Sequence, residues 1–187
     1  MTHTMEQKKP FKALDIAYIG VCTALIAVCS YISIPTVVPF TLQTLAVFLV
    51  MQILGGRNGF YSVLAYLLLG AVGVPVFAGF TGGPGVLFGT TGGYLIGFLL
   101  MAMLYWAAEA LVGEALWVRI VSLIAGLAVC YAFGTVWFLF LYNRSNDPVG
   151  ISTALGWCVL PFLIPDGIKL AAATGLAAAL RPVLRKQ

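Results

Sequence analysis

Charged residues are scarce in this sequence. Asp, Glu, Lys and Arg make up only 9% of its 187 residues, whereas apolar residues make up 61%. An average soluble domain is about 25% charged. Six acidic and ten basic side chains cannot cover the surface of a water-soluble fold of this length. The composition therefore excludes a soluble globular protein and predicts an integral membrane protein whose main solvent is the lipid bilayer.

The residues that many catalytic and metal sites need are missing from the apolar part of the chain. The only histidine is His3, in the N-terminal tail, which excludes a His-based catalytic pair or a His-ligated metal within the spans. The four cysteines show no Cys-x-x-Cys spacing and lie in apolar runs, as buried hydrophobic residues do. No Gly-Lys-Ser or Gly-Lys-Thr follows the glycine-rich segment 79–94, so an ATP site is not expected there. We expect no enzyme, no bound metal and no cofactor.

Several apolar runs approach the length of a membrane span, which takes about 20 helical residues to cross ~30 Å of hydrocarbon. We place six spans, near 13–34, 41–54, 59–74, 92–112, 116–141 and 161–181. The second and third are short and flank Gly55-Gly56-Arg57-Asn58-Gly59, whose glycines permit the tight turn of a helical hairpin. A further short helix is expected around 150–160, before the last span.

The predicted fold is an all-α bundle of six transmembrane helices in one membrane domain, residues 13–184, with tails at 1–12 and 185–187. Cytoplasmic loops are enriched in Lys and Arg, which sets the orientation. With both termini in the cytoplasm, the outer loops hold only Arg144. The inner side then holds Lys8, Lys9, Lys12, Arg57, Arg119, Arg181, Arg185 and Lys186. The net charge of +4 therefore reports topology in the cell membrane and indicates no nucleic-acid partner.

Asp166 and Lys169, within Pro165-Asp166-Gly167-Ile168-Lys169, are the strongest chemical signal in the chain. Counting from Arg181 at 1.5 Å per helical residue places them roughly 22 and 18 Å from the inner boundary, on one helix face. An ionisable residue near the membrane centre costs roughly 2.5 to 3.5 kcal/mol on insertion scales, so two of them indicate a polar cavity or mutual pairing. Pro165 is expected to free a helix N-terminus, which suits an anionic or carbonyl-bearing ligand. We favour a ligand site open to the outside, with a self-satisfied ion pair near the outer interface as the alternative.

Two other segments on the predicted outer side can contribute to such a site. The glycines of Gly79-Phe80-Thr81-Gly82-Gly83-Pro84-Gly85 let backbone approach a ligand or let a loop fold over it, although a flexible connector has the same composition. At the outer end of the second span, Thr41 can cap the helix. Gln43 and Thr44 beside it are candidate ligand contacts. The Gln43 amide offers both a donor and an acceptor, to a ligand or to a neighbouring helix.

Small residues form a stripe along the first span. They are Ala13, Ala17, Gly20, Ala24 and Ala27, at successive spacings of four, three, four and three. In lipid, helices associate where small side chains let their backbones approach closely. We therefore expect this face to touch another helix, which belongs either to this chain or to a partner. Gly93 and Gly97 form a similar pair that we assign to internal packing.

These motifs together resemble the BioY family, the biotin-specific S components of energy-coupling factor (ECF) transporters of prokaryotic cell membranes. The resemblance covers nearly the whole chain in the expected order. It rests on Pro39-Phe40-Thr41-Leu42-Gln43-Thr44-Leu45, Leu54-Gly55-Gly56-Arg57-Asn58-Gly59, Gly73-Val74-Pro75-Val76-Phe77, Gly89-Thr90-Thr91-Gly92-Gly93-Tyr94-Leu95 and Pro165-Asp166-Gly167-Ile168-Lys169.

The resemblance implies a six-helix subunit that takes biotin from outside and works with a transmembrane coupling subunit (the T component) and two ATPase subunits. It also implies that Asp166 and Lys169 contact biotin. Ala13 and Ala17 match the Ala-x-x-x-Ala coupling motif of the first helix, which Gly20 and Ala24 would extend. Whether the chain forms a homo-oligomer stays open.

The chemistry of biotin suits the residue types of this candidate site. Its ureido ring has two N–H donors and a carbonyl acceptor, its thiophane ring is apolar, and its valerate chain ends in a carboxylate. Asp166 can accept from the ureido N–H groups, and Lys169 can donate to the ureido carbonyl or to the carboxylate. Phe40, Phe80 and Tyr94 can cover the apolar ring, although aromatic residues are also common at membrane interfaces.

The remaining site candidates lie in the glycine-rich loop, where Thr81 offers the only side chain able to hydrogen-bond and Gly82 and Gly83 offer backbone. Three alternatives stay open besides biotin capture: an S component for another small vitamin, a small ion-coupled carrier or channel, and an intramembrane enzyme that uses the charged pair. Weak internal repetition argues against a carrier built from inverted halves.

Overall fold

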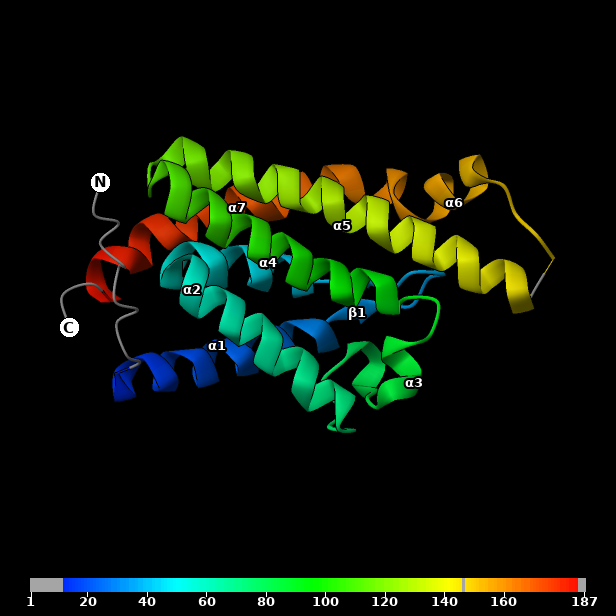
Figure 1. Ribbon diagram of the computed structural model, residues 1–187, viewed down its shortest axis with the longest axis horizontal. Coiled ribbons are helices and arrows are strands. Elements are labelled where there is room, and N and C mark those ends of the chain that lie inside the picture. Colours follow the sequence, from blue (N-terminus) through cyan, green and yellow to red (C-terminus); the bar gives the residue numbers. More distant parts are fainter. Residues whose placement is uncertain (1–11, 146, 185–187) are drawn as a thin grey trace, which may run out of the picture.

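The computed structural model describes residues 12–145 and 147–184, which are mostly helical (Figure 1). The elements in chain order are α1 (Ala13–Tyr31), β1 (Ser33–Ile34), β2 (Phe40–Thr41), α2 (Gln43–Ala71), the 3-10 turn η1 (Ala78–Phe80), α3 (Pro84–Leu87), α4 (Gly92–Val112), α5 (Leu116–Ser145), α6 (Ile151–Cys158) and α7 (Leu160–Leu184). The predictions for His3, Lys8, Lys9, Arg185 and Lys186 lie outside the described residues.

Within the described part of the chain, four segments are long and apolar enough to cross a membrane. They are Ala13–Tyr31, Gly92–Val112, Leu116–Arg144 and Ile151–Pro182. They match the first, fourth, fifth and sixth predicted spans, and α6 confirms the short helix expected around 150–160. The second and third predicted spans correspond to the two halves of α2, on either side of Gly55. Each half is shorter than the roughly 20 helical residues of a typical membrane span.

The chain reverses direction within α2, as the glycine turn predicted. Gly55 has φ 79° and ψ 173°, outside the helical region. Beyond it, the place of a Cβ on Gly59 is 3.1 Å from the Cα of Met51, whereas eight residues of unbroken helix would separate them by about 12 Å. Glu109 of α4 accepts a hydrogen bond from the Gly56 N–H, which caps the helix that starts again after the turn. The predicted hairpin is therefore confirmed.

Glycines hold α4 against α5. A Cβ on Gly93 would lie 2.4 Å from the Cβ of Trp137, and one on Gly97 would lie 2.7 Å from the Sγ of Cys130. Real side chains do not approach so closely, so both positions need glycine. The assignment of Gly93 and Gly97 to internal packing is confirmed.

The stripe of small residues on α1 is buried at one position and exposed at the other four. Ala27 is buried among the other helices of the chain, and Ala13, Ala17, Gly20 and Ala24 are exposed. Nothing lies within 4 Å of the place a Cβ on Gly20 would take. The four exposed members therefore do not pack on a described helix of this chain.

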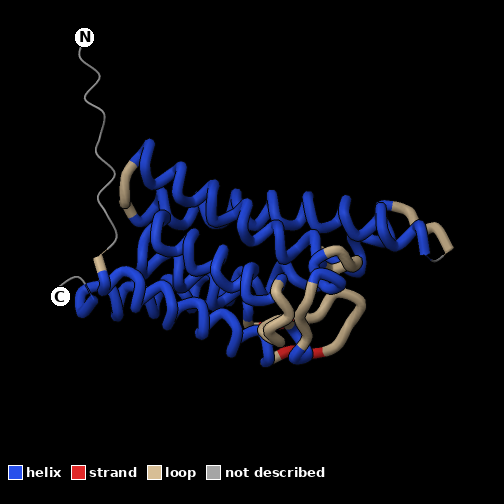
Figure 2. Tube along the Cα trace, turned by 60° about the horizontal axis from the view of Figure 1, so that its bottom comes forward, coloured by secondary structure: helices blue, strands red, loops and turns tan. Residues whose placement is uncertain are grey.

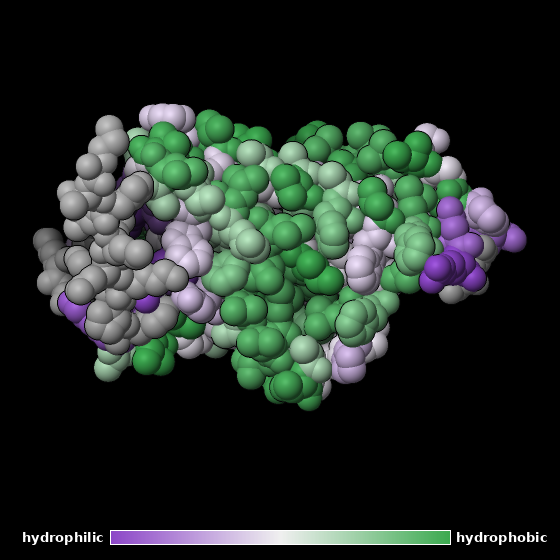
Figure 3. All heavy atoms as spheres, in the orientation of Figure 1, coloured by the Kyte–Doolittle hydropathy of each residue, from purple (hydrophilic) through white to green (hydrophobic). Residues whose placement is uncertain are grey.

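The two ends of the bundle differ in structure. The start of α1 and the end of α7 lie at the same end of the molecule (Figure 1). The opposite end carries the short β1–β2 pair, α3 and the loops around them (Figure 2). On the face shown in Figure 3, apolar residues cover the middle of the bundle and hydrophilic residues gather toward its two ends. This distribution is typical of a protein whose middle lies in hydrocarbon.

Candidate functional site

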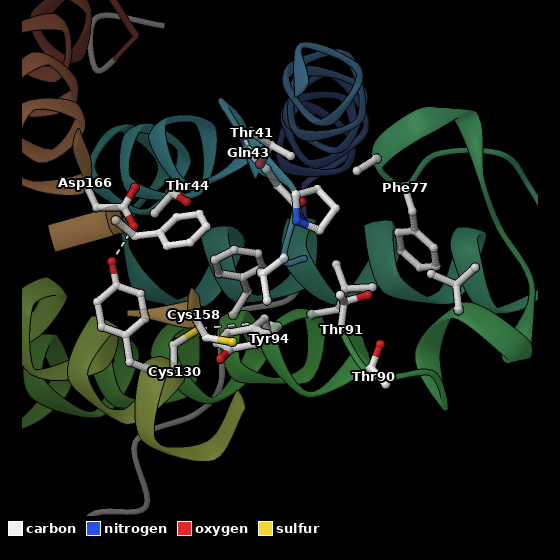
Figure 4. Close-up of a pocket in the computed structure, with 18 of the residues that line it drawn as sticks. Thr41, Gln43, Thr44, Phe77, Thr90, Thr91, Tyr94, Cys130, Cys158 and Asp166 are labelled. Carbon is white, nitrogen blue, oxygen red and sulfur yellow. Dashed lines mark hydrogen bonds between the residues drawn. The ribbon is translucent and has the colours of Figure 1, made fainter. Parts of the chain in front are cut away.

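A cavity of about 400 Å³ lies between the helices, nearer the end that carries the strands and α3. The chain segment around β2, the start of α2, the glycine-rich loop, α4, α5, α6 and α7 all contribute to its wall (Figure 4). Its size and its mixture of apolar walls with a few polar groups are typical of a site for a small organic ligand. Six predicted site residues line it: Gln43, Thr44, Thr81, Tyr94, Asp166 and Lys169.

Asp166 and Lys169 form an ion pair in the cavity wall. The Lys169 Nζ donates to the Asp166 Oδ1 at 2.7 Å. Asp166 is only 2% exposed and Lys169 only 6%. The two charges therefore satisfy each other, as the predicted alternative has it, and both buried side chains also line the cavity.

Two aromatic residues complete the surroundings of the ion pair. Tyr131 of α5 donates from its Oη to the Asp166 Oδ2 at 2.6 Å. The Lys169 Nζ lies 4.2 Å from the centre of the Phe40 ring, a cation–π geometry. Each ion of the pair thus has a contact from another element, Asp166 from α5 and Lys169 from β2, and both line the cavity.

The helix start expected at Pro165 is wrong. Helix α7 begins five residues earlier, at Leu160, and Pro165 lies inside it. Pro165 lacks an N–H and cannot bond the carbonyl four residues before it, but the helix continues because neighbouring residues hold it. Asp166 and Lys169 therefore project from a helix interior, and no helix N-terminus acts at this point.

Gln43 lines the cavity and carries a buried, unpaired polar atom. It is only 4% exposed, and its Nε2 has no hydrogen-bond partner among the described residues. Its backbone N–H bonds the Thr41 Oγ1 at 3.1 Å, which confirms the capping role expected of Thr41. A buried donor without an acceptor is costly. This position therefore favours a ligand that brings an acceptor.

The chain from the glycine-rich loop to the start of α4 lies across the cavity from Asp166 (Figure 4). Thr81, Thr90 and Thr91 line it there, although the Thr81 Oγ1 already donates to the Ala78 carbonyl at 2.9 Å. The Tyr94 hydroxyl lies 3.0 Å from the Thr135 Oγ1. This end therefore offers hydroxyl groups and no charged side chain among the residues that line it.

Four predicted site residues are not brought to the cavity surface. Phe80 is 66% exposed and stacks on Tyr31, with the ring centres 4.2 Å apart. A Cβ on Gly82 would lie 2.3 Å from the Val74 carbonyl oxygen, and the Gly83 N–H donates to the Gly70 carbonyl at 2.7 Å. Phe40 contacts Lys169 but is not among the residues that line the cavity. The folded path of the loop decides where Phe80, Gly82 and Gly83 lie, and composition does not reveal that path.

Sequence reasoning missed several lining residues. They are Thr90, Thr91, Cys130, Tyr131, Cys158 and Phe162, among others. Thr90 and Thr91 lie in the motif Gly89-Thr90-Thr91-Gly92-Gly93-Tyr94-Leu95, close in sequence to the glycine-rich loop, which is a signal that could have found them. Cys130, Tyr131 and Cys158 lie in apolar runs and look like ordinary packing residues, and only the approach of α5 and α6 to α7 brings them to the cavity.

Comparison with known proteins assigns this helical membrane fold with a buried ligand cavity to a family. The family model for BioY matches residues 3–186. The chain is 42% identical to the biotin transporter BioY of Thermotoga maritima over 163 residues, which cover 87% of this chain and 92% of that one. It is 39% identical to the biotin transporter BioY2 of Lactococcus lactis, over 84% of this chain and 85% of that one.

A solved structure agrees with the sequence relatives. The crystal structure of an S-component for biotin from an ECF-type ABC transporter superposes on this chain with a TM-score of 0.79 at 25% identity. The match covers 95% of this chain and 96% of the chain in the crystal structure. The chain belongs to the BioY family.

Proposed function

We propose that this protein binds biotin from the outer side of the membrane and serves its import as the substrate-binding S component of an ECF-type transporter. The relatives are biotin transporters and the structural match is a biotin S-component. The observation that carries the proposal is the buried Asp166–Lys169 pair in the wall of a cavity of about 400 Å³.

The polar groups of the cavity complement those of biotin. Asp166 accepts the ureido N–H groups, because it is the only acid among the described residues that line the cavity. Lys169 and the unpaired Gln43 Nε2 supply donors to the ureido carbonyl. The carboxylate then points to the opposite end, toward Thr90, Thr91 and the start of α4, whose partial positive charge favours an anion.

The proposed topology has six membrane crossings and both termini in the cytoplasm. The two halves of α2 count as the second and third crossings, and both are short. The described ends of the chain lie at one end of the bundle, as an even number of crossings requires. Arg57, Arg119 and Arg181 would belong to the cytoplasmic side, in keeping with the distribution of basic residues in membrane proteins.

The exposed small residues of α1 are the proposed contact with the transmembrane coupling subunit, which would work with two ATPase subunits. Ala13, Ala17, Gly20 and Ala24 are exposed and leave room for a helix backbone to approach. This surface lies on α1, whose outer face is separate from the cavity lining.

Calorimetric titration of the detergent-purified protein tests the proposal directly. We expect biotin to bind with one site per chain, while unrelated vitamins such as thiamine and riboflavin give no heat. Ion conductance in liposomes without an organic ligand would instead indicate a channel, and chemical change of the bound ligand would indicate an enzyme. Absence of biotin binding by folded protein would refute the proposal.

A further inference from the structure

Tyr131 joins the ion pair of α7 to a different helix. The Tyr131 Oη donates to the Asp166 Oδ2 at 2.6 Å, and the Lys169 Nζ donates to the Oδ1 at 2.7 Å. Each carboxylate oxygen thus has one donor from the protein. Because Lys169 shares a helix with Asp166, Tyr131 is the partner that ties the carboxylate to another wall of the cavity.

We propose that Tyr131 is a positioning residue for biotin recognition, which holds the Asp166 carboxylate so that its remaining acceptor sites face the ureido N–H groups. The proposal rests on the proposed function. It assigns a role that acts through Asp166 and needs no contact between the tyrosine hydroxyl and the ligand.

Counting hydrogen-bond sites supports this role. A carboxylate has about four lone-pair sites, in two pairs. Lys169 and Tyr131 occupy one site on each oxygen, so one site on each oxygen remains for two N–H donors of a ligand. A cyclic urea presents two N–H groups, and a fixed carboxylate can receive them without losing its protein partners.

Because the ion pair is buried, loss of the Tyr131 hydrogen bond should change the position of the Asp166 carboxylate. Asp166 is 2% exposed, so water does not replace a lost donor as it would at a surface. Without the Tyr131 hydroxyl, the carboxylate would be tethered only by Lys169 of its own helix. It could then turn toward the ammonium and present both oxygens poorly to the ligand. Preorganisation of this kind acts on affinity and on selectivity for N–H donors.

Tyr94 provides a matched control within the same cavity. It is also a lining tyrosine whose hydroxyl is hydrogen-bonded, but its partner is Thr135, at 3.0 Å. Removal of its hydroxyl therefore perturbs the cavity wall without releasing Asp166. Any loss of biotin affinity in Tyr94→Phe should be the same in the parent and the Asp166→Asn backgrounds, whereas a loss that acts through Asp166 should depend on the background.

The test is a double-mutant cycle measured by calorimetric titration with biotin. The proteins are the parent, Tyr131→Phe, Asp166→Asn and the double variant, with a second cycle in which Tyr94→Phe replaces Tyr131→Phe. The melting temperature of each ligand-free protein reports folding separately. We expect Tyr131→Phe to weaken biotin binding at least about tenfold in the parent background. In the Asp166→Asn background it should weaken binding less than about twofold, because the charged acceptor it positions is gone.

A second measurement keeps the test decisive if Asp166→Asn binds too weakly for calorimetry. A biotin analogue with one ureido NH replaced by oxygen competes against labelled biotin for the parent and for Tyr131→Phe. We expect the preference for biotin over the analogue to fall in Tyr131→Phe and to stay the same in Tyr94→Phe.

Three results would overturn the inference: biotin affinity of Tyr131→Phe within twofold of the parent, equal losses in both Asp166 backgrounds, or an unchanged preference in Tyr131→Phe. Failure of the parent itself to bind biotin would refute the proposed function instead.

Discussion

Breaking the Asp166–Lys169 pair from either side should cost both ligand affinity and stability. At 2.7 Å, two unit charges attract by about 6 kcal/mol with an effective dielectric constant of ~20, before the cost of burial is subtracted. Since both side chains are nearly inaccessible, removing one partner leaves the other charge buried alone. In proteins this costs roughly 3 to 5 kcal/mol of stability.

The expected loss of affinity follows from the same geometry. Asp166→Ala removes the acceptor for the ureido N–H groups, and Lys169→Ala removes a charged donor. Each variant should bind biotin more than tenfold more weakly, equivalent to over ~1.4 kcal/mol. Calorimetric titration gives the affinity, and thermal unfolding in detergent gives the stability of the ligand-free protein.

The double variant Asp166→Ala/Lys169→Ala separates the two effects. It leaves no unpaired charge, so its melting temperature should exceed that of at least one single variant, although binding stays weak. Thermal unfolding of all four proteins under one condition provides the comparison. Parent-like affinity in both single variants, or destabilisation that simply adds in the double variant, would refute the reasoning.

Two further predictions address packing and coupling. Gly93→Ala should lower the melting temperature, by a destabilisation of roughly 1 to 3 kcal/mol, because its methyl group would collide with Trp137. Gly175→Ala on α7, with open space around it, is the control and should not. Ala17→Leu should leave calorimetric biotin affinity unchanged but abolish labelled-biotin uptake by cells that supply the coupling and ATPase subunits. The control Ala17→Ser keeps a small side chain and should retain uptake. Uptake at the parent rate in Ala17→Leu, or an unshifted Gly93→Ala, would contradict these expectations.

Much of the fold could be predicted from the sequence because each signal is local. Runs of apolar residues mark the helices, since a chain in hydrocarbon must satisfy its backbone hydrogen bonds internally. The predicted 92–112 span coincides with α4, and the positive φ of Gly55 produces the predicted turn. The predicted 161–181 span matches α7, but the free helix N-terminus expected at Pro165 is wrong, because the helix continues through this proline.

The candidate site was predictable where one residue carries an unusual property. Asp166 and Lys169 stand out because charge is rare in an apolar span, and Gln43 stands out as a polar residue near a helix start. Phe80 looked equally suitable, but a left-handed residue at Gly79 (φ 69°) directs the loop so that Phe80 stacks on Tyr31. Such a path depends on contacts between distant segments.

By itself, the sequence determined that the protein lies in a membrane, where its helices run, and that two opposite charges share one helix face. These properties depend on composition and on spacing along the chain. The tertiary structure alone decided that Tyr131 bonds Asp166, that Gln43 lines the cavity with its buried Nε2 unpaired, and which loop residues reach that cavity. Those facts depend on how α2, α5 and α7 pack, because residues far apart in the chain meet only when their helices do.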